Sequence, residues 1–302
     1  MSSLAYTRSG QGAPLVLLHG IGSSRRAWDP VVPALARQFD VIAVDMPGFG
    51  GSPPIQASVT TTTTTAADAD ATQADPAALA RAVAVLLAEL GVTEPHVAGN
   101  SLGGWVALEL AAISPIASLT LLSPAGLWRG YAPAYSRVSL RASRWLTRYA
   151  AGPLSRLVKY RLGRALVLGQ THGHPIRMTP GCARSAITAM GTCSGFDATL
   201  TATATRRYLA TAPIGAPVAV AFGSRDVLLL RRQARHLDQL PPATRKETLP
   251  GCGHVPMADD PVAVAALISR TAARAEDPVR PSARSVTRQA QAGDPARSRS
   301  VR

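Results

Sequence analysis

Cysteine is scarce in this sequence, which has only three in 302 residues: Cys182, Cys193 and Cys252. An odd number without a C-x-x-C pair excludes a disulfide-stapled scaffold and a thioredoxin-like redox motif. Secreted folds of that kind depend on disulfides, whereas proteins in reducing compartments keep free thiols. The cysteine content therefore predicts a cytoplasmic protein.

Long uncharged apolar runs are missing as well. No segment has the length and freedom from charge that a membrane-spanning helix needs. Residues 1–8 lack the basic and then apolar build of a signal peptide. We therefore expect the apolar residues, 46% of the sequence, to fill the core of one large domain that carries an insertion.

Lysine is almost absent, because only Lys159 and Lys246 occur while the formal net charge is +14. The positive charge is thus nearly all arginine, beside much alanine, which a biased coding composition explains. No recognisable nucleic-acid module accompanies this charge. We expect no nucleic-acid partner.

A serine between glycines stands out in residues 96–110, where a short apolar run is followed by an alanine- and leucine-rich segment of helical period. The pattern predicts a strand, a sharp turn and a helix, with Ser101 at the apex. Gly99 and Gly103 lie where a Cβ would clash with the strained backbone of such a turn. The stretch matches the G-x-S-x-G nucleophile elbow, which makes Ser101 the predicted nucleophile.

Apolar runs alternate with helical stretches along most of the chain, which predicts an α/β fold with a mostly parallel, doubly wound sheet. Ligands of such sheets bind at the carboxyl ends of the strands, where Ser101 lies. The other predicted strands are 14–18, 40–45, 118–122, 216–222 and 244–249. The predicted helices outside the insertion are 28–38, 76–90, 228–240 and 261–275, with the elbow helix between them.

Two further strand ends carry the partners that a serine nucleophile needs. Asp226 follows the strand 216–222, and His254 lies in the loop 250–256 after the last strand. A serine hydroxyl needs a base that accepts its proton and an acid that orients the base. We therefore predict Ser101 as nucleophile, Asp226 as orienting acid and His254 as base.

Two backbone N–H groups are the predicted donors to a developing oxyanion: that of Leu102, after the serine, and that of Ile21, in the glycine-rich loop after the first strand. His19, in the same loop, is expected to brace the loop rather than to catalyse. For Asn100 two interpretations stay open, shaping the site or a purely structural role.

The alternation breaks at about residue 127 and resumes at about residue 213. The sequence therefore predicts an α/β core in two parts, 1–126 and 213–275, with a helical lid inserted at 127–212. Residues 276–302 read as a disordered basic tail. Residues 53–75, which include the threonine run 60–65, are expected to form a flexible surface excursion without chemistry.

Four arginines of the predicted lid step by four, three and four residues and share one helix face: Arg137, Arg141, Arg144 and Arg148. One interpretation is a solvated basic face opposite a buried apolar one. The other is a surface that attracts anionic substrates or anionic lipid headgroups, with weak membrane contact through the lid or the tail. The sequence leaves both open.

Histidines and cysteines also gather in the insertion, but their spacing fits no standard zinc site. We expect His172 and His174 to be loop residues and Cys182 and Cys193 to be buried thiols. The predicted chemistry needs neither a metal nor an organic cofactor.

Taken together, these motifs resemble the α/β-hydrolase superfamily, in its branch of lid-bearing small-molecule hydrolases. The likeness covers about residues 4–275 and rests on five motifs in the family's order, at 14–20, 45–50, 99–104, 223–226 and 251–256. It implies a serine-dependent hydrolase that cleaves a small-molecule carboxylic ester through an acyl-enzyme. Two departures are the short N-terminus, so that the family's first antiparallel strands are expected to be truncated or missing, and the threonine-rich excursion.

Several other reactions share this scaffold. The elbow also resembles that of hydrolases that cleave carbon–carbon bonds in ring-cleavage diketones, and perhydrolysis or acyl transfer to an alcohol would use the same residues. Dehalogenation would need an aspartate in place of Ser101, and a non-catalytic binding protein would not need all three of Ser101, Asp226 and His254. The sequence predicts neither the substrate nor the oligomeric state.

Overall fold

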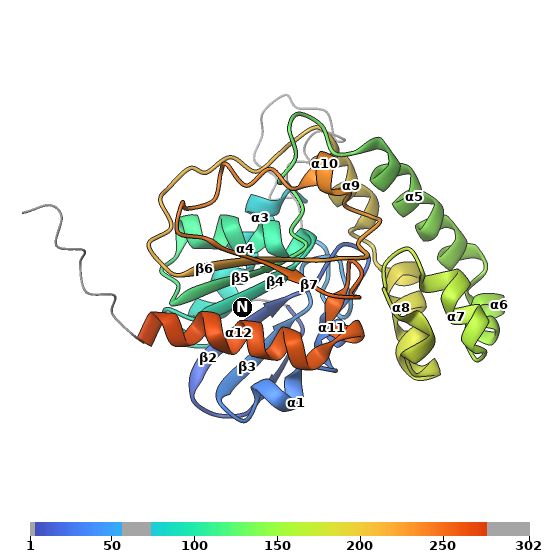
Figure 1. The fold of residues 1–302 in the computed structure, drawn as a ribbon, viewed down its shortest axis with the longest axis horizontal. Helices are drawn as coiled ribbons and strands as arrows, with labels where there is room; N and C mark the ends of the chain where they lie inside the picture. The colour runs from blue at the N-terminus through green and yellow to red at the C-terminus, as the bar shows by residue number, and fades with distance from the viewer. Residues whose placement is uncertain (1–3, 56–73, 277–302) are drawn as a thin grey trace, which may run out of the picture.

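The computed structural model describes residues 4–55 and 74–276, which form a central sheet with helices on both faces (Figure 1). Most of the predicted surface excursion 53–75, with its threonine run, lies outside the described residues, as does all of the predicted tail except Glu276. Among the described residues, no helix combines the length and the apolar character that crossing a membrane requires.

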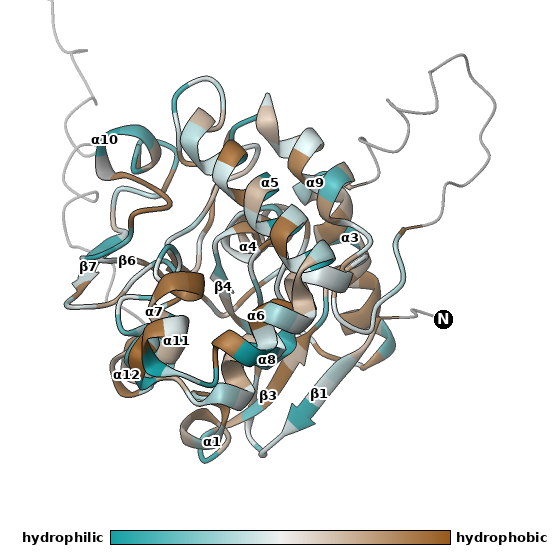
Figure 2. Cartoon of the chain, turned by 90° about the vertical axis from the view of Figure 1, so that its right-hand side faces the viewer, coloured by the Kyte–Doolittle hydropathy of each residue, from teal (hydrophilic) through white to brown (hydrophobic). Residues whose placement is uncertain are grey.

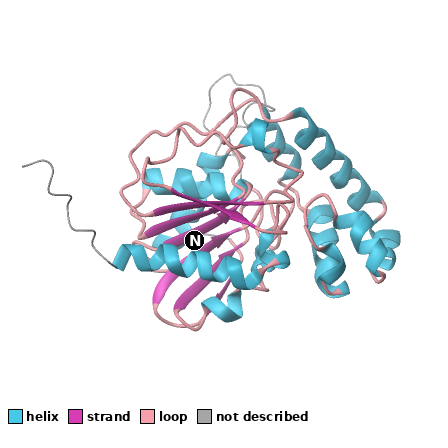
Figure 3. Cartoon of the chain, in the orientation of Figure 1, coloured by secondary structure: helices cyan, strands magenta, loops and turns pink. Residues whose placement is uncertain are grey.

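Seven strands form one sheet in the order β1-β3-β2-β4-β5-β6-β7 (Figure 3). Each neighbouring pair among them is parallel except β1 with β3. The predicted mostly parallel, doubly wound sheet is confirmed. The strands are β1 (Tyr6–Ser9), β2 (Ala13–Leu18), β3 (Phe39–Val44), β4 (His96–Asn100), β5 (Ser118–Leu122), β6 (Val218–Gly223) and β7 (Arg245–Leu249).

The N-terminal edge strand distinguishes the two expected outcomes. The short N-terminus predicted antiparallel strands that are truncated or missing, and the four-residue strand β1 pairs antiparallel with β3, with Tyr6 opposite Val44. The Arg8 guanidinium donates to the Asp40 carboxylate at 2.6 Å, which adds a polar contact to this exposed edge. One short antiparallel strand is therefore present.

Both faces of the parallel sheet are covered by helices. In β2, Leu15 and Leu17 pack with the helices on one face, while Val16 and Leu18 pack with the helices on the other. Successive side chains of a strand point to opposite faces, so a strand buried on both faces needs the continuous apolar run found here. The first face is covered by α1 (Val32–Leu35) and α12 (Pro261–Glu276), and the second by α3 (Pro76–Glu89) and α4 (Leu102–Ile113).

Two predicted helices are much shorter than expected. The helix predicted over 28–38 is a 3-10 turn at Arg25–Trp28 followed by the single turn α1. Pro30 interrupts it, because proline lacks an N–H and disfavours helical backbone before it. The helix predicted over 228–240 shrinks to α10 (Arg231–Ala234), and the backbone N–H of His236 donates at 2.9 Å to Leu127 O instead of to a helical acceptor.

Five helices lie between β5 and β6 in the sequence and lie together beyond one end of the sheet (Figure 1). They have a small apolar core of their own that includes Leu154, Val158 and Ile187. The predicted division of the chain at residues 127 and 212 remains a prediction. The inserted helices are α5 (Ala134–Tyr149), α6 (Ala151–Leu157), α7 (Arg161–Leu168), α8 (Pro180–Thr192) and α9 (Phe196–Ala204).

The orientation of α5 corrects the interpretation of a solvated basic face over a buried apolar one. Arg144 is buried and donates to Met190 O and, at 2.8 Å, to Cys193 O, whereas Trp145 is 63% exposed and Tyr149 68%. The reason is that two backbone carbonyls at the end of α8 need donors, and the guanidinium of Arg144 supplies them. Arg141 and Arg148 stay exposed.

Candidate active site

Ser101 lies between the end of β4 and the start of α4, with a backbone φ of +55° that L residues rarely adopt. The two neighbouring glycines make this turn possible. A Cβ on Gly99 would overlap the Gly103 carbonyl, and one on Gly103 would overlap the carbonyl of Leu18 in β2. The strained elbow therefore places the serine at the carboxyl end of the central strand.

Asp226 and His254 meet in a buried hydrogen bond. Asp226 follows β6, and His254 lies in the loop after β7; His254 Nδ1 and Asp226 Oδ2 are 3.0 Å apart. The other carboxylate oxygen accepts the backbone N–H groups of Leu228 at 3.0 Å and Leu229 at 2.9 Å. The carboxylate is thus oriented by this contact and by two backbone donors.

The ionisation of Asp226 reflects these contacts. Burial favours the neutral acid and so raises the pKa of Asp226, but the neighbouring His254 and the Leu229 N–H favour the carboxylate more strongly. The net result is a pKa below the ordinary value of 3.8. Asp226 is therefore the ionised partner that an imidazolium needs.

Ser101 and His254 line the same cavity, of about 50 Å³, together with Ile21 and Leu102. His254 Nε2 is buried and has no hydrogen-bond partner among the described residues, Ser101 Oγ included. In unliganded enzymes such contacts are often long and tighten when substrate binds. The structure thus brings all three predicted side chains to one site, with the bond between Ser101 and His254 still open.

The predicted oxyanion donors border this cavity. Leu102 opens α4, so its N–H has no acceptor within the helix. Gly20, directly before Ile21, lies so close to the serine that a Cβ on it would be 3.2 Å from Ser101 Cβ. The loop after β2 therefore approaches the nucleophile as an oxyanion donor must.

His19 braces the loop, as expected. Its Nδ1 is 2.8 Å from Gly20 O, and its Nε2 accepts the Met46 N–H at 3.1 Å. Burial lowers the pKa of His19. Both ring nitrogens are thus used by the neutral imidazole, which leaves none for catalysis.

Asn100 has a role that the sequence left open. Its Nδ2 donates to Leu122 O at 3.0 Å and to His254 O at 2.9 Å. The amide next to the nucleophile therefore ties the end of β5 to the backbone of the predicted base. This supports the interpretation that Asn100 shapes the site.

Asp259 is a residue that sequence reasoning missed. Its Oδ2 accepts the N–H groups of Gly173 and Gly253, each at 2.8 Å, and its Oδ1 accepts that of His174, also at 2.8 Å. One carboxylate thus joins the loop that carries His254 to a loop of the inserted helices. No sequence signal marks this role, since all three donors are backbone groups.

We expect Asp259→Ala to lower the free energy of unfolding by about 3 kcal/mol, because three partly buried backbone donors lose a charged acceptor at once. Turnover falls as well, since the loop of His254 is no longer held. Urea unfolding and steady-state kinetics measure both effects. The matched control is Asp260→Asn, whose carboxylate accepts only the Ala263 N–H at the start of α12; equal losses in both variants would contradict the assignment.

A second cavity of about 390 Å³ adjoins the first and shares Ile21 and Leu140 with it. Its walls are mostly apolar and come from the inserted segment, with Met178, Ile187 and Met190 among them, and from residues 21–30 after β2. The larger space is therefore open to an apolar part of a ligand whose reacting group lies at Ser101.

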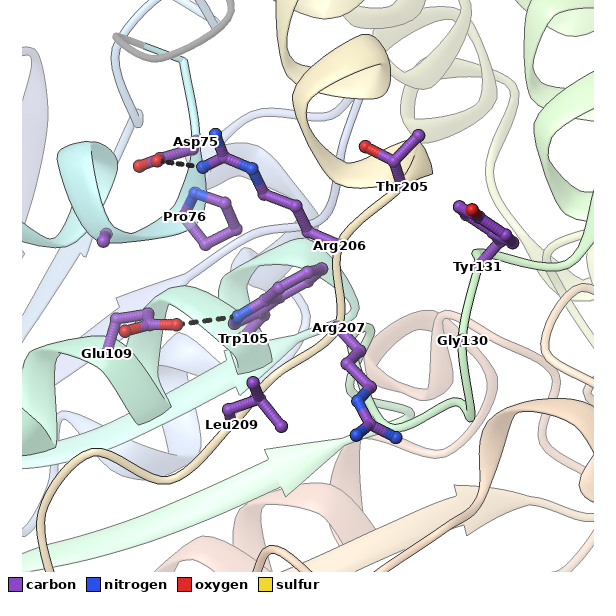
Figure 4. Close-up of a pocket in the computed structure, with 11 residues that line it drawn as sticks. Asp75, Pro76, Trp105, Glu109, Gly130, Tyr131, Thr205, Arg206, Arg207 and Leu209 are labelled. Carbon is purple, nitrogen blue, oxygen red and sulfur yellow. Dashed lines mark hydrogen bonds and ion pairs between the residues drawn. The ribbon is translucent and has the colours of Figure 1, made fainter.

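A third hollow of about 700 Å³ is an open groove that contains neither Ser101 nor His254. Figure 4 shows that four residues lining this groove already pair with one another. Arg206 donates to the Asp75 carboxylate, and Trp105 Nε1 donates to Glu109 at 2.9 Å. Size alone would favour this groove. The convergence of nucleophile, base and acid places the candidate site in the smaller cavity.

The histidines and cysteines of the insertion do not gather. Within residues 4–55 and 74–276, no three side chains of His, Cys, Asp or Glu are arranged to hold a metal ion. His172 is buried and its Nδ1 is 2.9 Å from Thr171 Oγ1, while Cys182 is exposed, against the expectation of a buried thiol. Cys182 lies in the first turn of α8. The residues of this helix that are buried are Ala183 and Ile187.

The chain is similar to known proteins in both sequence and structure. A dihydrolipoyllysine-residue acetyltransferase component of an acetoin cleaving system from Pseudomonas putida is 40% identical over 119 residues, which cover 38% of this chain and only 28% of that relative. A pimeloyl-[acyl-carrier protein] methyl ester esterase from Photobacterium profundum is 25% identical over 277 residues, which cover 86% of this chain and 94% of the relative.

A solved structure of a thermophilic esterase from Thermogutta terrifontis shares the fold, with a TM-score of 0.68 and 22% sequence identity. The match covers 91% of this chain and 94% of the esterase chain. The sequence profile of the alpha/beta hydrolase family matches residues 15–267, a span that includes most of β2, the elbow and the loop of His254. The chain therefore belongs to the alpha/beta hydrolase family.

Proposed function

We propose that this protein is a serine hydrolase that cleaves a small-molecule carboxylic ester through an acyl-enzyme. The observation that carries the proposal is the environment of His254. Its Nδ1 is held by the Asp226 carboxylate, which leaves a buried, unpartnered Nε2 in the same cavity as Ser101. A neutral imidazole so oriented is the base that a serine nucleophile needs.

In the proposed reaction, His254 Nε2 takes the proton of Ser101 as Oγ adds to the ester carbonyl carbon. The carbonyl oxygen becomes an oxyanion that the N–H groups of Ile21 and Leu102 stabilise. The intermediate collapses with loss of the alcohol, which receives the proton from His254. Water then adds to the acyl-enzyme with His254 again as base, and the carboxylic acid leaves as Ser101 regains its proton.

The two adjoining cavities support an apolar substrate. A cavity of about 50 Å³ around Ser101 has room for little more than the reacting group, since a water molecule takes about 30 Å³ in the liquid. The mostly apolar cavity of about 390 Å³ beyond Ile21 and Leu140 would take the remaining chain. The inserted helices that wall it would act as a lid. The relative from Photobacterium profundum, whose name describes a methyl ester esterase, agrees with this substrate class.

A panel of p-nitrophenyl esters from acetate to octanoate tests the proposal. We expect hydrolysis with a burst of p-nitrophenol, and a kcat/KM that rises as the acyl chain fills the larger cavity. A mass increase equal to the acyl group on Ser101 would identify the acyl-enzyme. If instead a vinylogous diketone is cleaved and no ester is turned over, the protein is a carbon–carbon bond hydrolase and the ester proposal fails.

A further inference from the structure

The inserted helix α5 is amphipathic in the opposite sense to a helix of an ordinary protein surface. Its inward side carries polar side chains beside Leu140: Ser136 Oγ donates to Leu228 O at 2.6 Å, Thr147 is buried, and Arg144 binds two carbonyls. A surface helix normally turns its apolar stripe to the core and its polar stripe to water. The outward apolar stripe of α5 therefore does not serve the folding of the chain.

Apolar side chains of α7 and the turn before it are exposed as well. Leu162 is 83% exposed and Leu166 79%, one turn apart on the same helix face, while Gly163, Arg164 and Leu168 face inward. Helices α5, α6 and α7 are the outermost elements beyond the sheet in Figure 1 and all face the viewer in Figure 2. We define the outer insertion face by the residues Val138, Trp145, Leu146, Tyr149, Tyr160, Leu162 and Leu166.

Positive charge surrounds this face without any acidic residue nearby in the sequence. No aspartate or glutamate occurs between Leu110 and Phe196. The Arg148 guanidinium lies 5.7 Å from the centroid of the Tyr149 ring, so cation and aromatic ring are presented together. The exposed cations of α5, α6 and α7 and of the turn between the last two are Arg141, Arg148, Arg156, Lys159 and Arg161.

We propose that the outer insertion face docks on an anionic lipid bilayer. Exposed tryptophan and tyrosine occupy the headgroup level of a membrane, leucine reaches the acyl boundary, and arginine pairs with lipid phosphates. A second copy of this chain is a poorer occupant, because two faces of the same positive charge would repel. Docking would bring the membrane close to the candidate active site, since Leu140 on the inward side of α5 lines the cavity of Ser101.

The full-length protein offers an intrinsic probe of docking. Of its four tryptophans, Trp28, Trp105 and Trp128 are buried and Trp145 is exposed. We expect vesicles of phosphatidylcholine mixed with phosphatidylglycerol to shift the tryptophan emission to the blue and to sediment with the protein. Vesicles of phosphatidylcholine alone should do neither, and Trp145→Phe should abolish the shift while most of the sedimentation remains.

Two surface variants assign the binding to this face. We expect Leu162→Ser combined with Leu166→Ser to weaken partition into the anionic vesicles at least about tenfold, and Arg148→Glu at least about fivefold. Matched controls are Val262→Ser, which replaces a 76% exposed side chain of α12, and Arg37→Glu, an exposed arginine outside the insertion. Unchanged far-UV circular dichroism and urea unfolding midpoints in all four variants would show that they fold.

Three results would overturn the proposal: equal binding to neutral and anionic vesicles, wild-type binding by the two face variants, or a dimer in sedimentation velocity that these variants dissociate. The second result would assign vesicle binding to another basic part of the chain. Because vesicle binding needs no turnover, Ser101→Ala should dock like the wild type. If the protein turns out not to hydrolyse esters, the vesicle-binding experiment can therefore still be carried out and interpreted.

Discussion

Ser101→Ala is expected to lower kcat by a factor on the order of 10⁴ to 10⁶ and to abolish labelling by a fluorophosphonate. The hydroxyl that attacks the carbonyl is gone, and what remains is the contribution of the oxyanion donors and of substrate binding. The fold should persist, because alanine keeps a Cβ and adopts the same backbone at the elbow. Ester kinetics and intact-protein mass spectrometry measure the two losses directly.

The control for this variant is Ser114→Ala, at the other end of the same helix, where the serine caps the C-terminus of α4. It should label and turn over like the wild type. A fluorophosphonate adduct on the Ser101→Ala protein would mean that another side chain is the nucleophile. Unaltered turnover in that variant would remove the acyl-enzyme proposal altogether.

The elbow could be predicted from the sequence because every cause of its geometry is local. Gly99 and Gly103 are needed where a Cβ would overlap backbone, and the apolar run before them marks a strand buried on both faces. Asp226 and His254 could be predicted by their places, since each follows a strand end and parallel strands end at the same edge of the sheet. The geometry of the hydrogen bond between them then follows from the fold.

The contacts of Asn100 and Asp259 could not be predicted in the same way. Asn100 donates to the carbonyl of His254, which is 154 residues away in the sequence, and Asp259 accepts N–H groups from Gly173 and His174. Backbone groups carry no residue identity, so a side chain that binds them leaves no pattern at the other end. Such roles become visible only when the loops are placed in space.

The face of α5 shows a second limit of sequence patterns. Helical spacing predicted that the four arginines share one side of α5, but in the structure Arg144 is buried while Arg141 and Arg148 are exposed. Spacing also does not say which side of a helix turns inward. That choice depended on the free carbonyls of Met190 and Cys193, which accept from Arg144. Because Arg144 is buried with hydrogen-bond partners and the aromatic stripe of α5 is exposed, this helix reverses the usual arrangement of an apolar side facing the core and a polar side facing water.

Asp226→Asn is expected to lower kcat at neutral pH by a factor on the order of 10⁴ with little change in the fold. The asparagine amide would donate to His254 Nδ1, so the neutral ring would carry its proton on Nε2 and could not accept that of Ser101. The loss of the negative charge also removes stabilisation of the imidazolium. Asp238→Asn is the matched control, an exposed carboxylate in the same connection between β6 and β7, and it should retain full activity.

The same substitution has a consequence for stability that depends on pH. The pKa of Asp226 lies below its ordinary 3.8 in the folded chain, so the ionised carboxylate favours the folded state. This stabilisation is complete above about pH 4 and is lost as the pH falls through the lowered pKa, because the unfolded state takes up the proton more readily than the folded state. The wild type should therefore unfold at higher urea than Asp226→Asn at neutral pH, with a difference that narrows in acid. A difference that is constant with pH would show that the Asp226 charge contributes nothing to the folded state, and the contact with His254 would then be a neutral hydrogen bond.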